Sequence, residues 1–276
     1  MIDAHLHFWN PEHLTYDWLQ YVPSISGRMG PAELAGAGVD IESAIFIQAD
    51  CAEALAEVDW INSLNFPILG IVAYAPLEIG DTPHITALKA KPNVVGIRRN
   101  AQNEPDGFMT SEGYLAGMIA AAQAGFSLDM CIRARQLPEL RQALTHLFGA
   151  VPDARVILDH LGKPDIRTHR VDIQSNDWAN EINALSDMPN VFCKLSGLPT
   201  EADWENWTPE QLRPWLDHAL KAFGPSRCLF GGDWPVVDLA GGYSRWQAVV
   251  TAALSHLTAD EQEQVWSRTA RRVYCV

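Results

Sequence analysis

The stretch SAIFIQADCAEALAEVDWINSL, residues 43 to 64, contains a strand followed by a helix, and the rest of the chain repeats its pattern. Its first part, Ser43–Asp50, is a nearly continuous apolar run of strand length, which is typical of parallel strands covered on both faces. Its second part, Ala52–Leu64, carries apolar residues at helical spacing, at Leu55, Val58, Ile61 and Leu64. The stretch therefore predicts one βα unit, with Asp50 as a candidate helix cap.

Seven further segments are apolar runs of the same kind: Ile2–Trp9, Ile68–Pro76, Val94–Asn100, Phe126–Arg133, Arg155–Gly162, Val191–Gly197 and Cys228–Val236. Helical periodicity lies between several of them, at Tyr114–Ala124, Leu137–Phe148, Asp177–Leu185 and Pro209–Phe223. A capping box at Thr258–Glu261 begins a last helix over Asp260–Val273. Eight alternating units predict an α/β protein with a single (β/α)8 TIM-barrel domain over residues 1–276. The alternative, a doubly wound sheet, lacks its glycine-rich phosphate loop after the first strand.

Composition and charge exclude several classes of protein and partner. Of the 276 residues, 47% are apolar and 20% are charged, which is typical of a globular protein and not of a disordered one. The net charge of −14 argues against nucleic acid or an anionic membrane surface as a partner. No apolar run reaches membrane-span length, and the N-terminus lacks a signal-peptide pattern. The five cysteines form no CxxC pair, so we expect reduced thiols and a cytoplasmic protein. The sequence leaves open whether the protein forms a homo-oligomer.

Polar residues stand where three of the predicted strands end, and barrel enzymes carry their reacting groups at this position. Alternation along the first strand points Asp3, His5 and His7 to one face. His160 follows an apolar run in the sixth segment, and Asp233 follows two glycines in the eighth. Each residue alone is more often a capping or hydrogen-bonded structural residue. Together they predict an active site in which histidines bind a metal or polarise a carbonyl and Asp233 acts as a base.

Cationic and aromatic side chains near the same strand ends are candidates for substrate binding. Arg98 and Lys194 suit a carboxylate or an oxyanion. Because Lys194 lies in mid-strand, it either faces the barrel mouth or pairs with a carboxylate. An aromatic set flanks the first and eighth strands and could cover the apolar face of a sugar-like ring: Trp9, Tyr16, Trp18 and Trp234. Gln48, near the end of Ser43–Asp50, completes the predicted substrate-binding set.

Several motifs taken together resemble the amidohydrolase superfamily: Asp3-Ala-His5-Leu-His7-Phe-Trp9, Gly96-Ile-Arg98, Asp159-His160-Leu-Gly162-Lys163-Pro, Cys193-Lys194-Leu-Ser-Gly and Gly232-Asp233-Trp234-Pro235. The chain is most similar to the amidohydrolase 2 branch, which contains L-fuconolactonase, L-rhamnonolactonase and pyrone-dicarboxylate lactonase. The resemblance runs from residue 2 to about residue 274 and implies a (β/α)8 barrel that hydrolyses a small lactone. It also implies that His5, His7 and His160 face the substrate carbonyl or a metal and that Asp233 activates water.

The chain departs from the superfamily pattern at two metal-binding positions. The fourth strand carries arginine where dinuclear members have a bridging lysine or glutamate, and the fifth strand carries no histidine. We therefore expect at most one divalent ion, with zinc favoured, on His5, His7 and Asp233, with Asp129 or His160 as a further ligand. An ester carbonyl needs less polarisation than an amide, so the resemblance also accommodates a reaction without metal.

The favoured hypothesis is a hydrolase that opens an aldonolactone, such as L-fuconolactone or L-rhamnonolactone, to the hydroxy acid. In this mechanism Asp233 activates water while the three histidines stabilise the oxyanion. One alternative is a metal-dependent decarboxylase, or a hydrolase of an aromatic acid's lactone. Another alternative is a catalytically silent barrel that binds a sugar acid.

Overall fold

The computed structural model covers residues 1–276 and describes all of them except 81 and 168–176. Eight short strands form one parallel sheet whose neighbours follow chain order. The strands are β1 (Ile2–Leu6), β2 (Ser43–Ile47), β3 (Ile68–Ala73), β4 (Val94–Ile97), β5 (Ser127–Met130), β6 (Val156–Leu158), β7 (Val191–Leu195) and β8 (Cys228–Phe230). The expected (β/α)8 barrel is confirmed, and the doubly wound alternative is excluded because its strand order would not be sequential.

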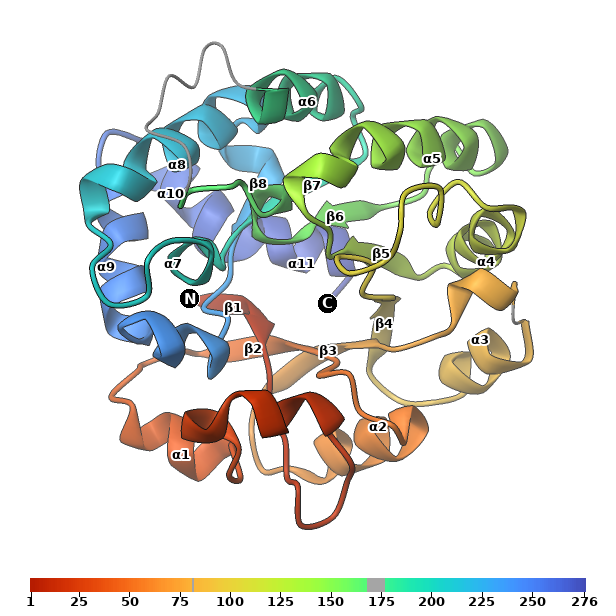
Figure 1. Ribbon diagram of the computed structural model, residues 1–276, viewed down its shortest axis with the longest axis horizontal. Helices are drawn as coiled ribbons and strands as arrows, with labels where there is room; N and C mark the ends of the chain where they lie inside the picture. The colour runs from red at the N-terminus through yellow and green to blue at the C-terminus, as the bar shows by residue number, and fades with distance from the viewer. Residues whose placement is uncertain (81, 168–176) are drawn as a thin grey trace.

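The barrel closes between its first and last strands (Figure 1). Leu6 forms a parallel bridge with Trp234, and the His7 amide donates to the Trp234 carbonyl at 2.9 Å. The Asp233 amide in turn donates to the His5 carbonyl at 2.8 Å. These bonds bring the ends of β1 and β8 together, so residues more than 220 positions apart in the sequence become neighbours.

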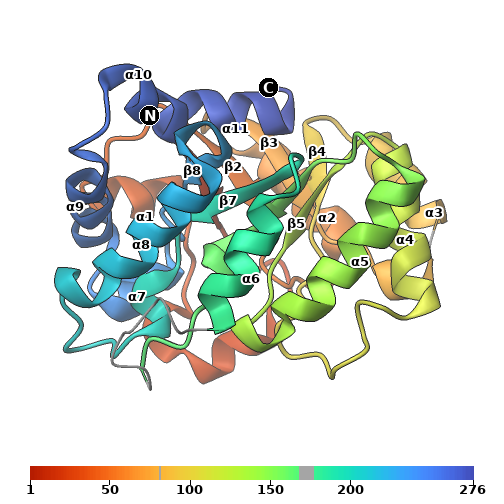
Figure 2. The same ribbon diagram turned by 90° about the horizontal axis from the view of Figure 1, so that it is seen from above.

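Helices surround the strands and cover their outer faces (Figures 1 and 2). In the described part of the chain they are α1 (Pro31–Gly36), α2 (Ala54–Ser63), α3 (Thr82–Lys89), α4 (Glu112–Gln123), α5 (Leu137–Ala150), α6 (Asp177–Ser186), α7 (Leu198–Glu201), α8 (Pro209–Phe223), α9 (Tyr243–Leu254), α10 (Ala259–Glu263) and α11 (Thr269–Tyr274). None of the described helices is long and apolar enough to cross a bilayer.

The predicted elements match the observed ones in place more closely than in extent. The α8 helix has the predicted bounds, whereas the predicted strand Ile2–Trp9 ends at Leu6. The last predicted helix divides into α10, a wider turn at Gln264–Arg268, and α11. The α1, α3, α7 and α9 helices were not predicted. The α1 and α7 helices are short, and short segments give little periodic signal.

The α11 helix closes one end of the barrel (Figure 2). Its residues Ala270, Val273 and Tyr274 pack against the side chains of Ile2 and Leu229 inside the barrel. Ile2 is the first residue of β1, so this apolar plug lies at the end where the strands begin. The opposite end, where the strands finish, is left for polar residues.

Candidate active site

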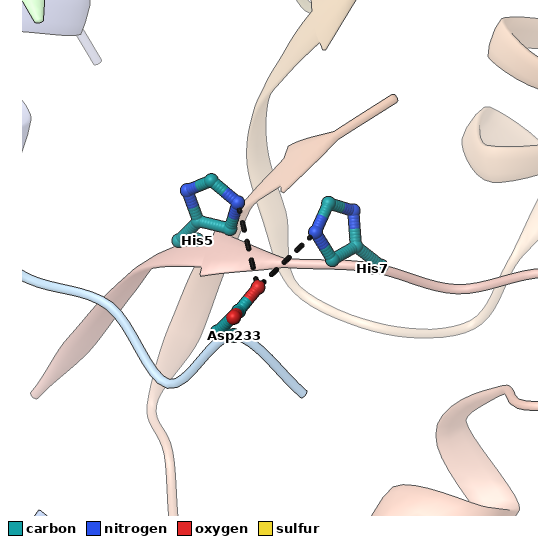
Figure 3. Close-up of side chains that lie close together, drawn as sticks. All are labelled: His5, His7 and Asp233. Atoms are coloured by element: carbon teal, nitrogen blue, oxygen red, sulfur yellow. Dashed lines mark ion pairs between the residues drawn. The ribbon is translucent and has the colours of Figure 1, made fainter. Parts of the chain in front are cut away.

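The ends of β1 and β8 bring two histidines and an aspartate together, as Figure 3 shows. Asp233 Oδ1 lies 3.7 Å from His5 Nε2 and 3.5 Å from His7 Nε2. The side chains of all three residues are buried or nearly so. His160, which follows β6, joins this cluster because its ring centroid lies 4.4 Å from that of His5. The four residues predicted to be catalytic therefore lie in one cluster.

Asp3 holds the two strands in this arrangement. Its Oδ1 atom accepts hydrogen bonds from the backbone amides of His5, at 2.8 Å, and Gly232, at 2.9 Å. Its Oδ2 atom accepts from the Tyr243 hydroxyl at 2.9 Å. A Cβ atom at Gly232 would lie 1.9 Å from Tyr243 Cε2, so only glycine allows the loop to approach this closely. The loop then turns through a left-handed residue, Asp233, with a φ of 58°.

Hydrogen bonds determine which imidazole nitrogens face the cluster. His7 Nδ1 lies 2.8 Å from the Ile47 carbonyl oxygen, which can only accept, so Nδ1 carries a proton and the ring is turned with Nε2 toward Asp233. His160 Nδ1 lies 2.9 Å from the Ser196 hydroxyl. Burial lowers the pKa of His160 to about 4, so this imidazole is neutral at pH 7.

Asp233 is an ionised carboxylate in this environment. Burial by itself raises its pKa, but the imidazoles of His160, His7 and His5 outweigh this effect and hold the pKa below the ordinary aspartate value. Its ionised carboxylate can accept a proton from water.

Lys194 lies beneath His5 and has no exposed surface. Its ammonium is paired with Asp129 and with Asp159, whose Oδ1 lies 2.9 Å away, and it lies 3.2 Å from His5 Nδ1. The Tyr274 hydroxyl donates to Asp129 at 2.6 Å. Of the two environments predicted for Lys194, the structure has the carboxylate pair, so direct contact with a ligand is not available to it here. Asp129 Oδ2 is likewise paired, and the two groups of donor atoms that could hold an ion among the described residues do not include Asp129.

Arg98, directly after β4, reaches the histidine cluster. Its Nη2 donates to the Gln48 carbonyl at 2.5 Å, and its Nη1 lies 3.3 Å from His5 Nε2 and 3.5 Å from Asp159 Oδ2. Gln48 has no exposed surface, and its side-chain amide is bonded to Asp50. In this structure Gln48 therefore orients Arg98 and does not itself face a ligand.

A cavity of about 240 Å³ opens at this end of the barrel. Of the predicted residues, its lining includes His7, Arg98, His160, Asp233 and Trp18. The Trp18 indole is fixed by a hydrogen bond to the Ala49 carbonyl at 2.7 Å. Trp234 is buried against Phe8 with a ring-centroid separation of 5.9 Å and does not form the aromatic wall predicted for it.

Several further residues of the cavity wall were not predicted from the sequence: Asp50, Asn100, Gln102, Asn103, Cys131, Lys163 and Thr200. Lys163 belongs to the motif that begins at Asp159, and Asn100 ends the fourth apolar run, so both lie near predicted strand ends. Nothing in the local pattern distinguished them from the polar residues of ordinary loops.

Glu57 on α2 supports the loop after β2 and predicts a pH-dependent stability. Its buried carboxyl accepts from the Ala49 amide at 3.3 Å, and burial raises its pKa from 4.5 to about 8. The folded protein therefore binds this proton more tightly than the unfolded chain. The free energy of unfolding falls as the pH rises from 4.5 to about 8. We expect Glu57→Gln to remove this dependence, so the melting temperature of the variant rises relative to wild type between pH 5 and pH 9. A difference that is constant with pH would contradict the assignment.

The donor atoms at the cluster fit one divalent ion. His5, His7 and Asp233 offer nitrogen and oxygen ligands that all lie within 4.8 Å of one another. Two imidazoles and a carboxylate are a set that zinc accepts, and the Ile47 carbonyl orients His7 as an outer partner should. A second group, which includes Asp159 and His160, fits less well, because Asp159 already pairs with Lys194. The Arg98 guanidinium beside His5 Nε2 competes with a cation there.

Known proteins are similar to this chain over most or all of its length. Residues 2–276 match the family model described as Amidohydrolase. The chain is 30% identical to an L-fucono-1,5-lactonase of Burkholderia multivorans, over 100% of this chain and 96% of that one. It is 24% identical to an L-rhamnono-gamma-lactonase of Scheffersomyces stipitis, over 75% and 66% of the two chains. A zinc-bound crystal structure of an amidohydrolase from Burkholderia multivorans has a TM-score of 0.87 and 29% identity, covering 100% and 99%.

Proposed function

Because this chain belongs to the amidohydrolase family, we propose that it hydrolyses the lactone of a sugar acid to the open-chain hydroxy acid. The observation that carries the proposal is the Asp233 carboxylate in the cavity wall, 3.5 Å from His7 Nε2 and beside the neutral His160 imidazole. Relatives named as L-fucono-1,5-lactonase and L-rhamnono-gamma-lactonase support an aldonolactone as the substrate class.

Asp233 begins the proposed reaction by removing a proton from water. The oxygen of that water attacks the lactone carbonyl carbon, and the carbonyl oxygen becomes an oxyanion. His160 is oriented by Ser196 so that its second ring nitrogen can donate to this oxyanion, and the Arg98 guanidinium supplies positive charge. The bond from the carbonyl carbon to the ring oxygen then breaks. The protonated Asp233 returns its proton to that oxygen, which becomes the hydroxyl of the product.

A divalent ion on His5, His7 and Asp233 would polarise the carbonyl when bound. The imidazoles and Arg98 perform the same stabilisation without it, so we propose that the ion is optional. His7, whose Nδ1 is fixed on Ile47, holds the water that Asp233 deprotonates. Trp18, which packs edge-on against the buried Trp9, is a packing surface in the cavity for the apolar face of a sugar ring.

The direct test is a screen of aldonolactones, including L-fucono-1,5-lactone and L-rhamnono-1,4-lactone, with a pH indicator that detects acid release. We expect hydrolysis of at least one aldonolactone. Decarboxylation of a carboxylated aromatic with zinc, together with inactivity on every lactone, would replace this proposal with the decarboxylase alternative. Saturable binding of a lactone without turnover over hours would favour the silent sugar-acid-binding barrel.

Metal analysis separates an optional ion from an essential one. We expect elemental analysis of purified protein to find at most one zinc per chain, since Arg98 competes beside His5 and Lys194 neutralises Asp159. Chelation should lower lactonase activity only in part, because oxyanion stabilisation remains in place. His7→Ala, which removes one ligand, should lower the zinc content further. Two ions per chain, or complete inactivation by chelator that zinc reverses, would contradict the proposal.

A further inference from the structure

A run of four left-handed residues forms part of the cavity wall. His160, Leu161, Gly162 and Lys163 have φ angles of 52°, 54°, 69° and 47°, and three of them are not glycine. Side chains with a Cβ avoid this conformation, so the surrounding structure must hold the turn in place. Such strain is found mainly at functional sites, where it directs particular side chains.

Contacts on both sides of the turn maintain it. The Lys163 amide donates to the His160 carbonyl at 2.8 Å, and the Trp178 indole donates to the Leu161 carbonyl at 2.7 Å. A Cβ atom at Gly162 would lie 2.8 Å from Leu137 Cδ2, so the turn packs tightly on α5. The result is that His160 and Lys163, three residues apart, both line the same cavity.

Lys163 retains hydrogen-bonding capacity in that position. Its Nζ donates to Gln102 Oε1 at 2.5 Å, and the Glu201 carboxylate lies 3.5 Å away. An ammonium has three N–H donors, and the hydrogen bond to Gln102 occupies one of them. The side chain is 13% exposed, which places the ammonium at the cavity wall and not in bulk solvent.

Arg98 is less available than Lys163. The lysine and arginine side chains among the described residues lining this cavity are Arg98 and Lys163. Arg98 directs its two terminal nitrogens to Gln48, His5 and Asp159. Lys194, the lysine that the sequence placed in substrate binding, is buried beneath His5. Lys163 is therefore the cationic side chain of the cavity wall with N–H donors available to bind a ligand.

We propose that Lys163, oriented by Gln102, binds hydroxyl oxygens of the sugar lactone and sets the preference of the enzyme for hydroxylated lactones. The inference rests on the lactonase function proposed above and adds the residue that selects the substrate. Hydroxyl oxygens accept from an ammonium, and a site built to donate to a hydroxyl discriminates strongly against a ligand that lacks it. Asn100 and Gln102 in the same wall offer further polar partners to a hydroxylated ring.

The test compares Lys163→Met with wild type on L-fucono-1,5-lactone and on δ-valerolactone, which has no ring hydroxyls. We expect kcat/KM for the hydroxylated lactone to fall about 10- to 100-fold, mainly through KM, as loss of a charged hydrogen bond predicts. The value for δ-valerolactone should change less than threefold. Methionine is unbranched like lysine, so the strain of the turn is the same in both proteins.

Three further variants control the comparison. Lys163→Arg should restore part of the discrimination between the two lactones, and Gln102→Leu should raise KM in the same direction by a smaller factor. Lys221→Met removes an exposed lysine from α8 and should change neither substrate. The melting temperature of Lys163→Met should stay close to that of wild type.

The outcomes separate this proposal from the lactonase function. An equal loss on both lactones, or a fall in kcat with unchanged KM, would overturn the role of Lys163 while leaving lactone hydrolysis standing. If wild type hydrolyses only the hydroxylated lactone, the kinetics of Lys163→Met on that lactone decide the role of Lys163. A raised KM supports the role, and a lowered kcat with unchanged KM overturns it. Inactivity of wild type on every lactone would instead reject the proposed function.

Discussion

We expect Asp233→Asn to lower kcat for lactone hydrolysis by at least about a hundredfold and to leave the fold intact. General-base assistance contributes ~10²–10⁴ in rate, and asparagine has no carboxylate to accept the proton from water. The amide has nearly the same shape, and asparagine tolerates the left-handed conformation that residue 233 adopts. The measurement is kcat and KM of purified variant and wild type, with circular dichroism and melting temperature to check folding.

Asp153→Asn is the matched control, because Asp153 is exposed and lies in the loop before β6. Its kcat should equal that of wild type. Near-normal turnover by a folded Asp233→Asn protein would remove Asp233 from the chemistry. The base would then have to be sought among the other groups of the cavity wall.

Lys194→Met should destabilise the protein severely, because Lys194 neutralises two buried carboxylates. Removing one partner of a buried ion pair costs about 3–5 kcal/mol, since the remaining charge stays buried without compensation. At this chain length such a loss lowers the melting temperature by roughly 10 °C. Asp129 and Asp159 are the carboxylates left behind, and both are fully buried.

A double variant separates the ion pair from a general packing effect. Lys194→Met with Asp129→Asn removes both a positive and a negative charge, so its melting temperature should lie above that of Lys194→Met alone. Lys221→Met again serves as the exposed lysine control. A normal melting temperature combined with a raised KM would return Lys194 to the substrate-binding role expected from the sequence.

The cluster at the ends of β1 and β8 was predictable because two simple rules act together. Alternation along a strand points His5 and His7 the same way, and closure of an eight-stranded barrel makes the first and last strands neighbours. Closure of the barrel therefore brings Asp233 close to both histidines. The apolar runs of the strands predicted the barrel because parallel strands are buried on both faces.

The extent of the elements was less predictable than their number. Trp9 belongs to the first apolar run, yet β1 ends at Leu6 and the residues beyond it pair with the loop from Gly27 to Met29. Hydrophobicity reports that a residue is buried and does not report what buries it. The aromatic cluster of Trp9 and Trp18 is therefore a product of loop packing, which local sequence patterns do not encode.

By itself the sequence determined the barrel, the strand ends that carry chemistry, and the convergence of His5, His7 and Asp233. Only the tertiary structure decided which lysine reaches the cavity. Lys194 and Lys163 both belong to motifs at strand ends, and their residue types are identical. Lys194 is inside the barrel, where Asp129 of β5 and Asp159, which follows β6, neutralise it. Lys163 faces the cavity because packing on Leu137 and Trp178 holds a left-handed turn that isolated residues would avoid.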